Sequence, residues 1–380
     1  MSRMRQAGVV AGSILVAALL AAGCSSSPTD GTDRKSTSSS ASPAAPSASV
    51  DTSEAASVRA RLDEAMEKHD GFSGTVLVAR GDEVLLSKGY GLSDAARGTA
   101  NGPTTRFRIG SLTKQFTAAA ILLLQEQGKL KVTDHMCEYI TRCPPAWKRI
   151  TLHHLLTHTA GLPEITELPQ FEAASKRPTT PDQQIGWVRS KPLDSAPGSN
   201  YHYSNTGYLA LGRVIEKVTG RSYETFIDTA ILDRLGMSDS GYDTGDDGVA
   251  VGYSRGTTVA APINMVVPHA AGALYSTTQD LLVWERALIG GHLLRPASLA
   301  AMTTSAVDTT ERIHFGYGYG IFVSLEPSKP VLVHDGGING FISLLIHDLS
   351  KEITVVVLTN HEDAPNLEYV AETLTLAVGG

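Results

Sequence analysis

The sequence predicts an α+β fold, in which an antiparallel sheet built from both chain ends carries flanking helices and an all-helical lobe is inserted between its two parts. Runs typical of strands, short and rich in β-branched residues, occur at residues 75–79, 84–87, 320–324, 331–333, 341–346 and 353–358. The segment between them is dominated by helix signals. Strands from the two ends must pair to form one sheet, so we expect a helical lobe over about residues 115–270.

Capping residues set the bounds of the expected helices. Gly128 and Gly220 each follow an apolar periodic run, and glycine readily adopts the left-handed conformation that ends a helix. Ser222 is a good N-cap, and Ser276 with Gln279 resembles a capping box. The expected helices cover residues 111–128, 205–219, 222–235 and 276–288.

The first residues resemble a lipoprotein signal peptide. Arg3 and Arg5 precede an apolar run from 7 to 22, which is short for a membrane-spanning helix. Cys24 follows a glycine at the expected cleavage site. We therefore expect residues 1–23 to be removed, Cys24 to be lipidated, and the protein to be exported and anchored to the outer face of the cell membrane.

A second composition change follows this leader. Residues 24–56 are rich in serine, threonine, proline and alanine and hold almost no large apolar residue. Such a segment cannot bury enough surface to offset the entropy lost on ordering. We expect a disordered tether there, and one folded domain over residues 57–380.

Ser111 and Lys114 form a Ser-x-x-Lys pair at the start of an expected helix. A serine hydroxyl is a poor nucleophile at neutral pH, and a lysine one turn away on the same face can hold or accept its proton. The helix N-terminus also favours a developing negative charge. The structural alternative is that Ser111 is an ordinary N-cap and Lys114 a solvated residue of the first turn.

Two further motifs lie downstream. Tyr203-Ser204-Asn205 opens the expected helix from 205 to 219, where it could also be an ordinary cap. His334-Asp335-Gly336-Gly337 follows an apolar strand, and its glycines let a ligand approach the backbone closely. Together the three motifs predict an acylating serine hydrolase.

The chain resembles the serine β-lactamase and penicillin-binding family, in particular the class C-like branch that holds D-Ala-D-Ala carboxypeptidases, D-aminopeptidases and esterases. The resemblance covers about Gly71 to the C-terminus and implies a β-lactamase/transpeptidase-like fold. It rests on the three motifs and on the segments at 107–118, 155–163, 203–208, 235–237 and 357–360.

The resemblance implies a role for each motif residue. Tyr203 would be the general base for Ser111, with Lys114 stabilising the phenolate, because an adjacent ammonium lowers the pKa of a phenol. Asn205 would bind the carbonyl or amide of the substrate. The backbone amides of Ser111 and Gly337 would form the oxyanion hole.

The third motif departs from its carboxylate-binding relatives. His334 is mostly neutral at pH 7, because the ordinary pKa of histidine is about 6.5. Asp335 stands where those relatives carry a hydroxyl and adds a negative charge. We therefore expect ester, amide or peptide substrates without a free carboxylate at this strand. We also expect His334 to be catalytic and to manage protons and charge with Tyr203 and Lys114.

Two alternatives remain at this stage. One is a D-alanyl-D-alanine carboxypeptidase or weak β-lactamase, which would act on peptidoglycan stem peptides or β-lactams. The other is a non-catalytic envelope binding protein of the same fold.

The cysteines, the histidines and the net charge indicate which other kinds of site the chain can have. Cys137 and Cys143 should form a disulfide in an exported protein. The histidines at 153, 154 and 158 include an i, i+4 pair, but no acidic base lies between them as in a zinc protease, so we expect no metal and no other cofactor. The net charge of −7 and the lack of a basic cluster exclude a nucleic-acid surface.

Overall fold

The computed structural model of the chain describes residues 52–379, except 175–176, 178, 246, 310–311 and 365. Cys24 and the expected signal peptide lie outside these residues, as does the tether up to residue 51. Helix α1 (Thr52–Glu67) begins inside the segment that was expected to be tether. Among the residues described, no helix is long and apolar enough to cross a membrane.

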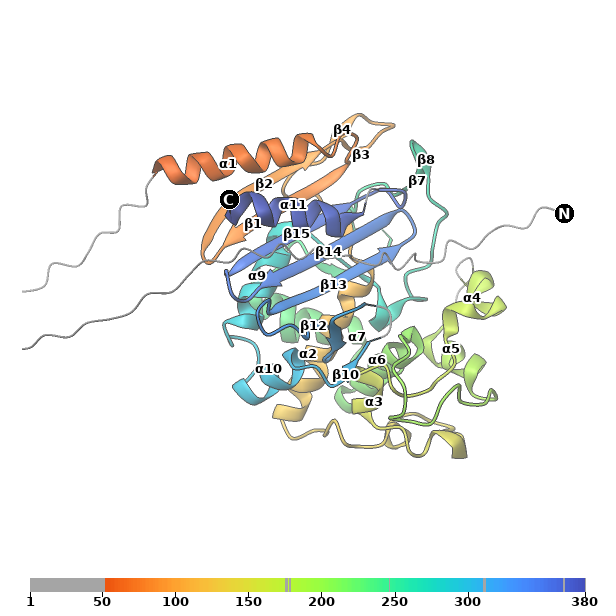
Figure 1. The fold of residues 1–380 in the computed structure, drawn as a ribbon. Coiled ribbons are helices and arrows are strands. Elements are labelled where there is room, and N and C mark those ends of the chain that lie inside the picture. The colour runs from red at the N-terminus through yellow and green to blue at the C-terminus, as the bar shows by residue number, and fades with distance from the viewer. Residues whose placement is uncertain are drawn as a thin grey trace, which may run out of the picture.

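An eight-stranded antiparallel sheet forms the centre of the domain, with the order β10-β11-β12-β13-β14-β15-β1-β2 (Figure 1). The first strand of the chain, β1, lies between the second strand, β2, and the last one, β15, and pairs with both, so the sheet is assembled from both chain ends. The predicted fold class is confirmed. The strands of this sheet are β1 (Gly74–Arg80), β2 (Glu83–Tyr90), β10 (Val307–Asp308), β11 (Phe315–Tyr317), β12 (Phe322–Ser324), β13 (Val331–Ile338), β14 (Phe341–Asp348) and β15 (Ile353–Thr359).

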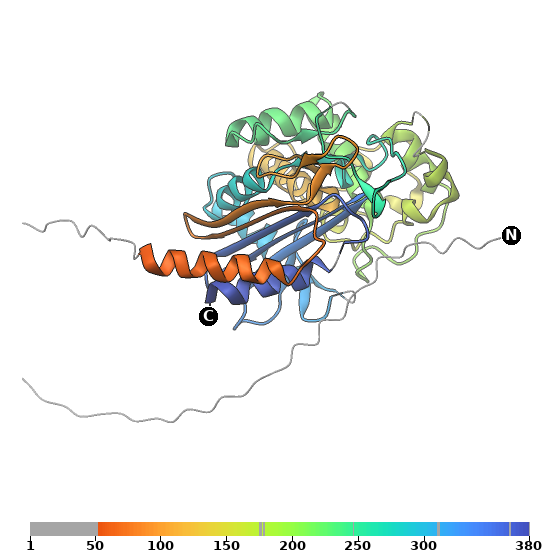
Figure 2. The same ribbon diagram turned by 90° about the horizontal axis from the view of Figure 1, so that it is seen from above.

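Both faces of the central strands are buried, and alternate residues of each strand face different cores. Val76 and Val78 of β1 pack with α1 and α11 (Leu367–Gly379), whereas Leu77 and Ala79 pack with the helical lobe. Helices α1 and α11 lie side by side on one face of the sheet (Figures 1 and 2). This arrangement explains why β1 and β15 are almost continuously apolar.

The helical lobe and the short strands beside it lie against the opposite face (Figure 1). Helix α6 has the predicted bounds and ends at Gly220 in the left-handed conformation. The predicted capping box at Ser276 is wrong: Thr277 is the N-cap of α9 and accepts from the amide of Asp280. The α-helices here are α2 (Thr113–Glu126), α3 (Leu152–Leu156), α4 (Pro169–Ala174), α5 (Pro181–Val188), α6 (Asn205–Thr219), α7 (Tyr223–Ile227), α8 (Asp233–Leu235), α9 (Thr278–Ile289) and α10 (Pro296–Thr303).

Short elements connect these helices. The helix predicted from Ser222 to Leu235 is interrupted by a π-helical turn, η5, between α7 and α8. The remaining elements are the 3-10 helices η1 (Gly110–Leu112), η2 (Met136–Glu138), η3 (Pro145–Trp147), η4 (Ile165–Glu167) and η6 (His269–Ala271), the π-helix η5 (Asp228–Leu232), and the strands β3 (Leu92–Asp94), β4 (Thr99–Ala100), β5 (Phe107–Arg108), β6 (Gly241–Tyr242), β7 (Tyr253–Arg255), β8 (Thr258–Val259) and β9 (Leu274–Ser276).

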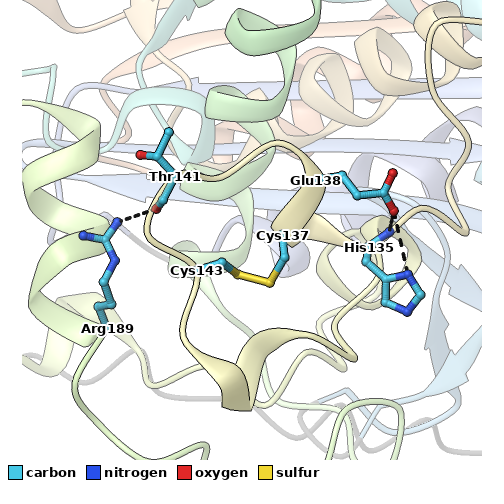
Figure 3. Close-up of a disulfide and its surroundings, with 6 residues drawn as sticks. All are labelled: His135, Cys137, Glu138, Thr141, Cys143 and Arg189. Carbon is cyan, nitrogen blue, oxygen red and sulfur yellow. Dashed lines mark hydrogen bonds and ion pairs between the residues drawn. A yellow bond between two sulfur atoms is a disulfide. The ribbon is translucent and has the colours of Figure 1, made fainter.

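The predicted disulfide between Cys137 and Cys143 is present (Figure 3). It closes a short loop that starts in η2, and Arg189 donates a hydrogen bond to the carbonyl of Thr141 inside that loop. Glu138 accepts from the amide of His135, which is the N-cap of η2. The disulfide is therefore a structural feature of the helical lobe, outside the three motifs.

Candidate active site

Ser111 lies in the tight turn between β5 and α2. Gly110 has a φ of +48°, and a Cβ at this position would stand 2.9 Å from the backbone nitrogen of Gly337. The turn can therefore pass close to β13 only with a glycine here. Ser111 is not the N-cap of α2, because Leu112 holds that position and no side chain caps it. The structural alternative for Ser111 is thus excluded.

Lys114 is completely buried at the base of this turn. Its Nζ lies 2.9 Å from Ser111 Oγ, 2.9 Å from Asn205 Oδ1 and 2.9 Å from the carbonyl oxygen of Ala271. An ammonium has three donors, so these partners match its full hydrogen-bonding capacity. The ring of Tyr203 lies 4.8 Å from the same nitrogen. Lys114 therefore joins the first motif to the second.

Burial reverses the proton states that the sequence suggested for Lys114 and Tyr203. It lowers the pKa of Lys114 to about 7, although the negative charges of Glu164 and Asp335 oppose this fall. It raises the pKa of Tyr203 well above its usual range, and the hydrogen bond between Tyr203 and Ser111 does not overcome this rise. The expected lowering of the Tyr203 pKa by Lys114 is wrong, because desolvation outweighs the nearby charge.

The second motif is held by the first turn of α6. Ser204 is the N-cap, and its Oγ accepts from the amide of Gly207 at 3.2 Å. Glu164 accepts from the amide of Asn205 at 2.8 Å and from its Nδ2 at 3.0 Å. The side chain of Asn205 therefore bridges Lys114 and Glu164 in a fixed orientation.

His158 supports the second motif from below. Its Nδ1 accepts from the amide of Ser204 at 2.9 Å, and its ring lies 4.3 Å from that of Tyr203. It has a φ of +59° and lies beyond the end of α3, so it does not form a helical i, i+4 pair with His154. Nδ1 of His154 instead accepts from the amide of Thr151. Among the described residues, no three or more His, Cys, Asp or Glu side chains are grouped so that they could hold a metal ion.

Strand β13 carries the third motif past Ser111. Its pairing with β12 ends at Val333, so from His334 onward β14 is its one strand partner within the described residues. A Cβ at Gly336 would stand 2.2 Å from the carbonyl oxygen of Ile109 and 2.9 Å from the amide of Ser111. Ser343 of β14 fixes the same turn by donating to Ile109 at 2.8 Å. The free edge of β13 is thus placed beside the serine.

The side chain of His334 is buried and both its nitrogens are occupied. Nδ1 lies 2.6 Å from the carbonyl oxygen of Asp335, so it must be the donor, and Nε2 then accepts from the hydroxyl of Tyr317 at 3.0 Å. Burial lowers the pKa of His334 to about 4, against the opposing charge of Asp335. The imidazole is therefore neutral, as expected, but it holds the strand and Tyr317.

Asp335 is turned toward an arginine. Its Oδ1 accepts from Arg312 at 2.9 Å, and Arg312 also pairs with Glu368 of α11 at 2.6 Å. The negative charge that the sequence placed beside the substrate is thus partly neutralised at the rim of the sheet.

The structure brings Ser111, Lys114, Tyr203 and Asn205 together and sets Gly336 and Gly337 beside them. Sequence reasoning missed several members of this network, namely Glu164, Tyr317, Arg312 and the carbonyl of Ala271, and it considered His158 only as a possible metal ligand. Glu164 directly follows the segment 155–163 that carried the resemblance, and an acidic residue inside an apolar stretch was a usable signal. The contact of Lys114 with the carbonyl of Ala271 could not be predicted, because every residue has a backbone carbonyl whatever its side chain.

Comparisons with known proteins agree with this geometry. Residues 58–379 match the family Beta-lactamase. PbpX of Bacillus subtilis, whose name marks it as a candidate penicillin-binding protein, is 31% identical over 309 residues, which cover 80% of this chain and 74% of that protein.

Two solved structures share the fold. A penicillin-binding protein from Bacillus halodurans superposes with a TM-score of 0.74 at 25% identity, over 83% of this chain and 98% of the other. A D-stereospecific amidohydrolase from Streptomyces superposes with a TM-score of 0.67 at 26% identity, over 83% and 97% of the two chains.

Proposed function

The chain belongs to the beta-lactamase family of serine hydrolases, and from that premise we propose that it hydrolyses esters or amides through an acyl-enzyme on Ser111. One observation carries this proposal: a completely buried lysine with a pKa of about 7 lies 2.9 Å from the serine hydroxyl. At neutral pH such a lysine is unprotonated in a substantial fraction of molecules. It can then accept the proton of Ser111.

In the proposed acylation step, Ser111 Oγ attacks the carbonyl carbon of the substrate while its proton moves to the neutral Nζ of Lys114. Tyr203 keeps its proton because its pKa is raised, so it serves as a hydrogen-bond donor and passes a proton to the leaving group. The ammonium of Lys114 returns the proton to Tyr203 through the hydroxyl network. Water then attacks the acyl carbon and gives its proton to Tyr203 while the proton of Tyr203 passes to Lys114. Lys114 returns that proton to Ser111 Oγ as the bond between Oγ and the acyl carbon breaks.

The oxyanion of the intermediate would bind the backbone amides of Ser111 and Gly337. The close packing of the turn at Gly110 against the nitrogen of Gly337 supports this assignment. Asn205 has two N–H groups on Nδ2, and Glu164 accepts one of them. The other is available for a carbonyl group of the substrate.

The substrate class follows from the charges at the strand edge. His334 is neutral and buried, and Arg312 is already paired with two carboxylates. Among the described residues, these groups therefore offer no unpaired cation to a substrate carboxylate at β13, which favours uncharged esters and amides. The amidohydrolase with the same fold is consistent with an amide substrate.

A fluorophosphonate probe and a substrate panel test the proposal. The probe should label wild type but not Ser111→Ala. Ser199 is an exposed serine outside the site, so the control variant Ser199→Ala should be labelled like wild type. The panel contains a nitrophenyl ester, a D-amino acid amide, a D-Ala-D-Ala peptide and a chromogenic cephalosporin. A preference for the last two would support a carboxypeptidase or β-lactamase instead, and a lack of both labelling and turnover would support a binding protein.

We further propose that the protein is exported and held at the membrane by a lipid on Cys24. The motif at Cys24 and the relative named as a penicillin-binding protein support this localisation. Wild type should partition into the detergent phase, and Cys24→Ala should not. Equal partitioning of the two would contradict lipidation.

A further inference from the structure

Glu164 is a buried acid that the proposed reaction does not use. It lies between the helices α3 and η4, and only 7% of its surface is exposed. A buried carboxylate is costly unless hydrogen bonds or opposite charges compensate it. The partners of Glu164 therefore indicate what this acid does.

The carboxylate accepts hydrogen bonds from two sides. Toward α6, Oε2 accepts from the amide of Asn205 at 2.8 Å and Oε1 accepts from its Nδ2 at 3.0 Å. Toward its own turn, Oε1 accepts from the hydroxyl of Thr166 at 2.7 Å and from the Thr166 amide at 3.2 Å. The charge also lies at the N-terminus of a 15-residue helix, where the helix dipole favours an anion.

These contacts determine the orientation of the Asn205 amide. An ionised carboxylate only accepts hydrogen bonds, so the side-chain nitrogen of Asn205 must face Glu164. Its oxygen is then directed at Lys114, 2.9 Å from Nζ. Without an acceptor in the place of Glu164, the amide could turn and present its nitrogen to the lysine.

The charge of Glu164 also acts on Lys114 directly. Burial favours the neutral lysine, and the charges that oppose it are those of Glu164 first and Asp335 second. The other titratable groups near this ammonium are His158 and His334, whose pKa values it lowers, and the phenols of Tyr203 and Tyr208, whose rings it faces. Among these groups, Glu164 shares a hydrogen-bonded partner, Asn205, with the lysine.

We propose that Glu164 is a positioning residue of this site: it holds Asn205 with its carbonyl oxygen toward Lys114 and thereby controls how readily the lysine gives up its proton. The inference rests on the proposed function, because Lys114 matters as a base only if Ser111 is the nucleophile. It assigns no contact between Glu164 and the substrate.

The decisive variant is Glu164→Gln, which keeps the size of the side chain and removes the charge. We expect kcat/KM to fall about tenfold at its optimum, through misplacement of Asn205. We also expect the acidic limb of the pH profile to move to lower pH by about one unit, because removal of a nearby opposite charge favours the neutral lysine. A merely structural role would lower activity without moving this limb.

Glu285→Gln is the matched control. Glu285 is equally buried in α9, outside the site, and neither of its oxygens accepts a hydrogen bond from a described residue, although His347 lies 3.8 Å away. Burial raises the pKa of Glu285 to about 8, so its carboxyl group is already neutral at the pH of the limb, and the control repeats the substitution at a buried glutamate without changing the charge. Its pH profile should match that of wild type. If Glu164→Gln and Glu285→Gln both leave the limb in place, the inference is overturned.

A double-mutant cycle with Asn205→Ala tests whether Glu164 acts through Asn205. The two losses in kcat/KM should be strongly non-additive, since each variant removes the same oriented amide. Additive losses would overturn the inference. Glu164→Asp, which keeps the charge, should restore the wild-type position of the limb, and it serves as the second variant if Glu164→Gln folds poorly.

Fluorophosphonate labelling separates this inference from the proposed function. If Ser111 is labelled in wild type and the limb does not move in Glu164→Gln, the inference alone fails. If Ser111 is never labelled, the proposed function fails first.

Discussion

The two sides of the candidate active site are built differently. On one side, Ser111, Lys114 and Asn205 form a closed network, in which each polar group has a partner and the lysine is completely buried. On the other side, β13 presents a strand edge that has no strand partner beyond Val333 among the described residues, and its acid, Asp335, is 44% exposed in its side chain.

The difference separates reactivity from selectivity. Burial is what lowers the pKa of Lys114, so in the proposed reaction the closed side determines whether the serine can react. The open side carries the backbone groups and the Arg312–Asp335 pair that the substrate would meet in the proposed reaction. Changes on the closed side should therefore lower all activities by large factors, whereas changes on the open side should alter substrate preference by small ones.

The largest effect is expected for Lys114→Met. The apolar chain fills the same space, but Ser111 loses its proposed base, and the carbonyl of Ala271 loses its donor. We expect kcat/KM for every substrate to fall by about 10³ or more, within the usual range for a general base. Lys129→Met, at an exposed lysine just beyond α2, is the control and should keep full activity. Retention of activity in Lys114→Met would show that reactivity does not depend on the closed side.

Tyr203→Phe should have the next largest effect, and its size should depend on the leaving group. Because the raised pKa keeps Tyr203 protonated, its proposed role is to donate a proton. We expect a loss of about 10² in kcat/KM for amides and alkyl esters. A nitrophenyl ester, whose leaving group needs no proton, should lose much less. Equal losses for both substrates would instead support a general-base role for Tyr203.

The sequence predicted the fold, the disulfide and the grouping of the motifs, because each rests on local patterns or on residue types. The fold follows from apolar strands at both chain ends, as in β1 and β15. It did not predict the proton states, because the pKa of Tyr203 depends on desolvation by side chains that are distant in the sequence. The ring of Tyr317, for example, packs near that of Tyr203.

Backbone contacts and ion pairs between residues that are distant in the chain could not be predicted from the sequence either. The carbonyl of Ala271 reaches Lys114 across 157 positions of the chain. The partner of Asp335 is Arg312, which precedes β11, and neither residue type nor spacing pointed to this pair. The predicted effect of Asp335 on the substrate therefore needs to be restated for a carboxylate that is already paired.

The pH dependence of acylation distinguishes the two sides by proton state. As pH rises through about 7, Lys114 loses its proton and kcat/KM should rise about tenfold per unit below that value. His334 is neutral at any pH above about 4, so it should add no step between pH 5 and 8. A stopped-flow profile with a neutral ester measures this limb. A limb near pH 4 with none near 7 would assign control to the open side.

The smallest effect is expected for Asp335→Asn, which tests the open side alone. The asparagine oxygen can still accept from Arg312, so the strand should keep its geometry, while one negative charge is removed. The ion pair is partly exposed, and such pairs are worth about 1 kcal/mol or less. We therefore expect kcat/KM for a cephalosporin or a D-Ala-D-Ala peptide to rise only about threefold relative to a neutral ester, because Glu368 still compensates Arg312. Asp63→Asn, which alters a comparably exposed pair with Lys88 away from the site, should leave this ratio unchanged. A rise of a hundredfold or more would mean that Asp335 repels the substrate directly, and an unchanged ratio would mean that the edge of β13 does not select substrates by charge.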